Sequence, residues 1–136
     1  MDRSIISLLA SIFLLETGSG LLGIVIPVRA ENAGFHTETI GVLGTLHYVG
    51  FVLGCIKLPD LIRRSGHVRS FAALAAIAAC AVLAFALTSS QAAWMALRVA
   101  LGICFAGMFM VTESWLNDRS TSETRGRLLG NYMAAT

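Results

Sequence analysis

Hydrophobic positions in this chain are gathered into long runs, and polar residues are confined to short gaps between them. A helix needs about 20 apolar residues to cross a hydrocarbon core of about 30 Å. Four runs reach that length, and a fifth begins near Leu128. The pattern predicts an all-α membrane protein, a helical bundle of four transmembrane helices plus the start of a fifth. The predicted helices cover residues 4–28, 40–58, 68–88, 92–116 and 127–136.

Composition supports this prediction and excludes other classes of protein. Hydrophobic residues make up 56% of the 136 residues and charged residues only 13%, whereas an ordinary soluble domain is about 25% charged. So low a charge rules out a disordered tail and argues against a soluble enzyme. A net charge of +2 without a basic stripe gives no reason to expect a nucleic-acid partner, and the expected surroundings are the lipid bilayer.

The sequence contains no motif for catalysis or metal binding. Its three histidines and three cysteines have no metal-ligand spacing. The letters GxGxxG at Gly18, Gly20 and Gly23 lie in the middle of a span instead of after a strand, so they do not predict a phosphate loop. We therefore expect no enzyme, no metal and no cofactor.

The distribution of basic residues predicts the orientation of the spans, because cytoplasmic loops are enriched in Lys and Arg. With the N-terminus in the cytoplasm, the outer side carries Arg29 alone. We expect an integral protein of the bacterial inner membrane, in which Pro27 and Pro59 end the first two spans and Gly66 breaks the inner loop. The eight basic residues of the inner side are Arg3, Lys57, Arg63, Arg64, Arg69, Arg119, Arg125 and Arg127.

Charged residues inside the spans are the candidates for function, because a charge near the bilayer centre costs about 2.5–3.5 kcal/mol on the insertion scale. Glu16 lies about 16 Å from the inner edge of the first span, at 1.5 Å per residue. Ser19, Gly20 and Gly23 share its helix face. This stripe predicts a substrate or proton pathway, with a protonated carboxyl that bonds to a neighbouring helix as the alternative.

Arg98 lies within the fourth span, at a depth similar to that of Glu16. Arginine stays charged, so it needs an anion, either a protein carboxylate such as Glu16 or an anionic substrate. His47, on a face with Gly44 and Gly54, either lines a cavity or bonds to a backbone carbonyl. Glu113, close to the inner surface, is expected to form a gating or structural salt bridge with Lys57 or with Arg63 and Arg64.

Small residues mark expected helix contacts. Gly50 and Gly54 form a GxxxG pattern that lets two helices approach closely, and Gly102 lies on the polar face of the fourth span.

The inner loop from Gly54 to Arg69 resembles the loop between the second and third helices of major facilitator superfamily transporters. The family pattern is Gly-x-x-x-Asp-Arg-x-Gly-Arg-Arg or Lys. With Gly66 aligned, Arg64 takes the position of the first arginine and Arg69 a later basic position. Arg63 stands where the family has aspartate, and Asp60 lies three residues earlier.

Two further segments carry the resemblance. Arg98-x-x-x-Gly102 is similar to the Arg-x-x-x-Gly pattern of the family's fourth helix. Glu113-Ser-Trp-Leu-Asn117, followed by Arg125-Gly-Arg127, resembles a narrower group, the YcaD-like transporters. The resemblance implies a fold of twelve helices in two halves. Residues 1–136 would then be part of the N-terminal six-helix half, with the C-terminal half missing.

The same resemblance implies a secondary transporter of a small molecule, working by alternating access, with proton coupling through Glu16 as an option. Asp60, Arg63, Arg64, Gly66 and Arg69 would form the inner gating loop. Two alternatives stay open: a small four-helix multidrug exporter acting as a dimer, and a membrane scaffold that transports nothing.

Overall fold

The computed structural model describes residues 3–135, and within that range every regular element is a helix. The first four helices are each long and apolar enough to cross a membrane, which confirms the predicted all-α fold with four spans. In chain order the helices are α1 (Arg3–Asn32), α2 (Thr37–Ser65), α3 (His67–Leu87), α4 (Gln91–Arg119) and α5 (Arg125–Ala135).

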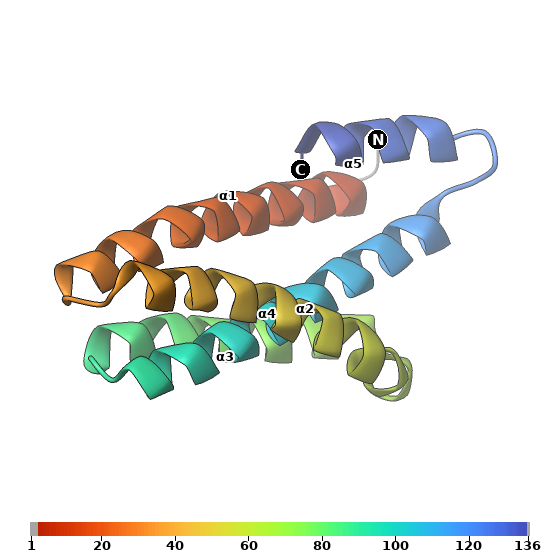
Figure 1. Ribbon diagram of the computed structural model, residues 1–136. Helices are drawn as coiled ribbons and strands as arrows, with labels where there is room; N and C mark the ends of the chain where they lie inside the picture. Colours follow the sequence, from red (N-terminus) through yellow and green to blue (C-terminus); the bar gives the residue numbers. More distant parts are fainter. Residues whose placement is uncertain (1–2, 136) are drawn as a thin grey trace.

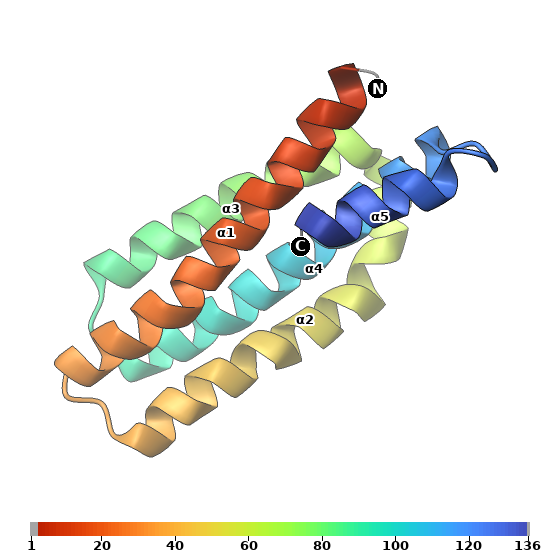
Figure 2. The same ribbon diagram turned by 90° about the horizontal axis from the view of Figure 1, so that it is seen from above.

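Helix α4 forms the centre of the bundle, and α2 and α3 provide most of its contacts (Figures 1 and 2). Within its most apolar segment 56% of the residues are buried, against 11% for α1. Large apolar side chains of α1, such as Leu14 and Ile24, are consequently exposed. Such a surface suits contact with lipid or with further helices, because it has no favourable contact with water.

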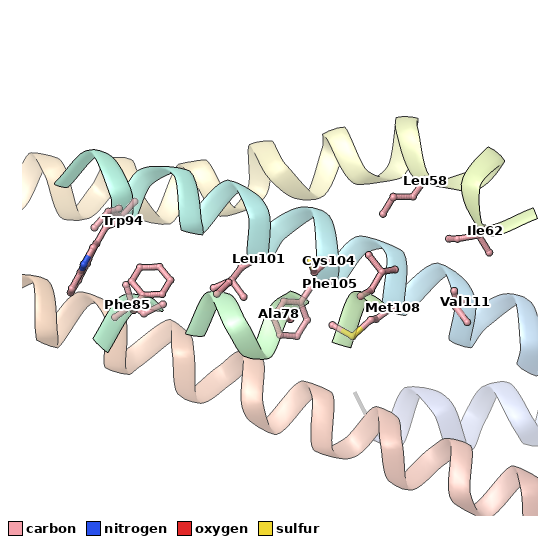
Figure 3. Packing of buried hydrophobic residues seen from close by; sticks show 14 of the residues in the cluster. Leu58, Ile62, Ala78, Phe85, Trp94, Leu101, Cys104, Phe105, Met108 and Val111 are labelled. Atoms are coloured by element: carbon pink, nitrogen blue, oxygen red, sulfur yellow. The ribbon is translucent and has the colours of Figure 1, made fainter. Parts of the chain in front are cut away.

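The main core extends along α4 from Trp94 to Val111 (Figure 3). At one end Trp94 packs against Phe85, and near the other end Ile62 of α2 lies close to Val111. The indole Nε1 of Trp94 donates to the Thr88 carbonyl over 2.8 Å, which satisfies the one polar group of this buried ring.

Helices α2 and α4 approach most closely at glycines, where no side chain separates the two backbones. A Cβ built on Gly50 would lie 2.1 Å from the Val99 carbonyl oxygen, and one on Gly54 would lie 2.9 Å from that of Ile103. Gly102 faces α2 in the same way. All three glycines therefore lie in one contact, where any larger residue would force the backbones apart.

The prediction that Pro27 and Pro59 end the first two helices was wrong. Both prolines lie inside helices, since α1 continues to Asn32 and α2 to Ser65. Proline removes one backbone hydrogen bond, and near a helix end water or a neighbouring group can replace that partner. The inner loop is thereby reduced to Gly66, whose φ of 82° favours glycine and whose N–H donates to the Ile62 carbonyl.

Helix α5 packs along the N-terminal half of α1 (Figure 2). Leu128 joins Leu8, Ile12 and Leu116 in a second apolar cluster, separate from the main core. The last residue of the predicted fifth run, Thr136, lies outside the described residues.

Candidate functional site

A cavity of about 240 Å³ lies where α1, α2 and α4 meet, and we call it the central cavity. Two of the three residues predicted for the pathway, His47 and Arg98, line it, together with Tyr48 and Phe105, which were not among the predicted site residues. Its full lining is Ser19, Leu22, Gly23, Pro27, Gly44, His47, Tyr48, Arg98, Leu101 and Phe105.

Arg98 brings a positive charge into this cavity. Only 7% of the residue is exposed, and its Nε donates to the Leu43 carbonyl of α2 over 3.1 Å. Among the described residues, no carboxylate pairs with it. The ion pair with Glu16 that the sequence left open is therefore not formed, because the guanidinium is turned toward the backbone of α2.

His47 lies beside this charge on α2. Its ring packs edge-on against Tyr48 and Phe105, with centroid separations of 5.7 and 6.0 Å. Its Nδ1 is buried and has no hydrogen-bond partner within residues 3–135. The central cavity is thus lined by a cation and by an imidazole ring whose Nδ1, itself buried, has no hydrogen-bond partner in the described residues.

Glu16 lies in a second, more open hollow of about 570 Å³ on α1. Ser19, Gly23 and Tyr48 line both this hollow and the central cavity, so the two spaces adjoin. Glu16 itself does not line the central cavity, because Ser19, about one helix turn further along α1, takes that place.

Glu113 has a different partner from the one expected. Its carboxylate accepts a hydrogen bond of 2.9 Å from the Tyr132 hydroxyl of α5, and no salt bridge to Lys57, Arg63 or Arg64 forms in the described part of the chain. Glu113 lines a cavity of about 350 Å³ between α4 and α5, whereas Arg63 lines a different pocket, which it shares with Ser114 of α4.

At the C-terminal end of α2 the predicted gating residues form a polar turn. Asp60 pairs with Arg63 one helix turn away, while Arg64 and Arg69 are exposed. His67, which the sequence reasoning did not select, places its Nε2 3.1 Å from the Ser114 hydroxyl of α4. This contact ties the turn at Gly66 to the central helix.

No group of three or more His, Cys, Asp or Glu side chains within residues 3–135 is placed to hold a metal.

Residues 8–136 match the family model of the major facilitator superfamily. The chain belongs to the major facilitator superfamily (MFS). The resemblance carried by the inner loop and the fourth span is thereby confirmed.

Several MFS-type transporters are similar to this chain, each at 30% identity. They include an uncharacterized MFS-type transporter of Enterobacter sp. strain 638, matched over 97% of the chain, and MFS-type transporters named YcaD from Escherichia fergusonii, over 96%, and Salmonella enteritidis, over 98%. The chain spans about a third of the length of these relatives, 34–35%. No solved structure was found to match it.

Proposed function

We propose that this chain lines the substrate path of a secondary transporter that moves a small molecule across the bacterial inner membrane. The observation that carries this proposal is the central cavity, in which apolar spans hold Arg98 buried and without a carboxylate partner in the described residues. A charged side chain within a span raises the free energy of membrane insertion. Such residues usually face a bundle interior or a water-filled path.

The relatives are about three times as long as this chain, so we propose that further helices complete the path. Those helices would cover the exposed apolar face of α1 and close the hollow at Glu16. Alternating access then means that the two sets of helices rock against each other around the central cavity. Neither the four-helix exporter nor the scaffold is favoured, since the relatives are named as MFS-type transporters.

We propose two further roles within this transporter. Glu16, in the open hollow beside the cavity, exchanges protons with the path and couples substrate movement to the proton gradient. The inner turn formed by Asp60, Arg63, Arg64, Gly66 and Arg69 acts as the gate, and its link to α4 through His67 and Ser114 transmits the movement.

The test uses the complete gene product in proteoliposomes with an imposed pH difference. A defined mixture of carboxylates, amino acids, sugars and amphipathic cations is added, and the compounds inside are measured by mass spectrometry. At least one compound should accumulate only when the protein is present. Glu16→Gln should abolish accumulation driven by the pH difference and keep downhill exchange.

Glu31→Gln makes the same substitution at the exposed outer end of α1, so it should behave like the wild type. If no compound moves faster with the protein than in empty liposomes, the transporter proposal is wrong. If compounds move but Glu16→Gln has no effect on the pH dependence, the proton role of Glu16 is wrong.

A further inference from the structure

Arg98 has hydrogen-bond donors left over for a ligand in the central cavity. Its Nε donates to the Leu43 carbonyl, and this is the one hydrogen bond that its side chain forms within residues 3–135. The two terminal nitrogens of the guanidinium therefore remain available. A charge that is buried without a counter-ion is strongly unfavourable, so an anion that enters the cavity meets a cation that is already desolvated, and only the anion's own desolvation opposes their attraction.

We propose that the central cavity binds a small carboxylate, held by the guanidinium of Arg98 and by the imidazole of His47. This inference rests on the proposed function and names the chemical class of its substrate. A carboxylate presents two oxygens in the plane and at the spacing of the guanidinium fork. His47 lines the same cavity, and because its buried Nδ1 has no partner in the described chain, no hydrogen bond holds the ring against turning a protonated nitrogen toward the ligand.

The volume and the apolar walls of the cavity limit the size and polarity of the part of the ligand beyond its carboxylate. About 240 Å³, divided by about 30 Å³ per water-sized group, leaves room for roughly eight non-hydrogen atoms. Leu22, Leu101 and Phe105 give the cavity apolar walls. A carboxylate with a short organic tail covers these walls, whereas an inorganic anion leaves them without contacts.

The neighbouring titratable groups predict how Glu16 affects carboxylate binding. The groups that face the two adjoining hollows are Glu16 from α1, His47 and Tyr48 from α2, and Arg98 from α4. Ionised Glu16 repels a carboxylate, and protonated Glu16 does not. Substitution of Glu16 by glutamine should therefore leave carboxylate binding as tight as in the wild type or tighter.

The test compares lactate and benzoate with lactamide and benzamide, in which a neutral amide replaces the carboxylate at nearly the same size. Binding to the complete gene product in detergent micelles is measured by isothermal titration calorimetry. We expect at least one of the two carboxylates to bind at least ten times more tightly than its amide. Arg98→Lys should weaken binding about tenfold, and Arg98→Met should abolish it.

Arg119→Met removes a charge from the exposed inner end of the same helix and should bind as the wild type does. If neither carboxylate binds the wild type, or if each amide binds as well as its acid, the inference is wrong. This comparison needs no variant, so it decides the matter even if Arg98→Met fails to fold.

Failure of this inference is distinguishable from failure of the proposed function. Carboxylate binding without any movement in proteoliposomes would overturn the transporter and keep the binding site. Glu16-dependent movement of a sugar or a cation, with no carboxylate binding, would keep the transporter and overturn the carboxylate site.

Discussion

Gly102 of α4 lies against the main chain of His47 in α2, so that a Cβ built on Gly102 would lie 2.0 Å from the His47 carbonyl oxygen. Arg98, one turn before Gly102, bonds to the carbonyl of Leu43, one turn before His47. The closest helix contact thus lies beside the two polar groups of the central cavity, and it fixes how far apart they are.

We predict that Gly102→Ala destabilises the protein by about 1–3 kcal/mol, because a methyl group there forces two packed backbones apart. The free energy of unfolding can be measured by chemical denaturation in detergent, followed by circular dichroism. Gly41→Ala on α2 is the control, since nothing lies within 4 Å of a Cβ built there. Equal stability of the Gly102 variant and the wild type would contradict the close contact.

The fold could be predicted well from the sequence, because the length of each apolar run shows whether it can span the membrane. The close pair Gly50 and Gly54 was also visible as a spacing, since small residues four apart lie on one helix face. The ends of the helices were less predictable. Pro59 gave a strong stop signal, yet the helix continues to Ser65, because one lost backbone bond does not outweigh the packing of Leu58 and Ile62 on α4.

The polar partners could not be predicted, for a different reason. Arg98 bonds to a backbone carbonyl, and every residue has one, so no residue pattern identifies Leu43 as the acceptor. The partner of Glu113 depends on how α4 and α5 are rotated about their axes. The sequence did show a tyrosine, Tyr132, in the last apolar run. It could not show that this hydroxyl reaches Glu113, because that depends on where α5 packs.

The end of the bundle at which Trp94 lies provides a second stability prediction. Trp94 is 2% exposed, packs edge-on against Phe35 and Phe85 with both centroid separations at 5.2 Å, and donates to the Thr88 carbonyl. Trp94→Phe loses that hydrogen bond and part of the buried ring. We expect a loss of about 1–3 kcal/mol in the free energy of unfolding.

Trp115→Phe is the matched control, because Trp115 is only half-buried and packs against the smaller second cluster. It should lower the free energy of unfolding clearly less than Trp94→Phe does in the same denaturation experiment. A larger effect at Trp115 would mean that the aromatic cluster around Trp94 does not hold α3 and α4 together.

The distribution of basic residues predicts the orientation of the chain, which cysteine labelling can test. In a variant without Cys55, Cys80 and Cys104, a single cysteine is introduced at Ser89 or at Ser122. A maleimide that cannot cross membranes should label Ser89→Cys in intact bacteria, and Ser122→Cys only after the cells are opened. The reverse pattern would place the N-terminus outside.

The hydrogen bond from Tyr132 to Glu113 should couple α5 to α4. Tyr132→Phe removes the donor and Glu113→Ala the acceptor, so each single change loses the same bond. We expect a coupling energy of about 0.5–1.5 kcal/mol in a double-mutant cycle on the free energy of unfolding, below the roughly 1.5–3 kcal/mol typical of charged acceptors because the pair is exposed. Glu113→Gln keeps an acceptor and should therefore be milder than Glu113→Ala. Strictly additive effects would show that the two side chains act independently, and the attachment of α5 would then rest on the apolar cluster around Leu128 and on the hydrogen bond from Arg125 to Asn117.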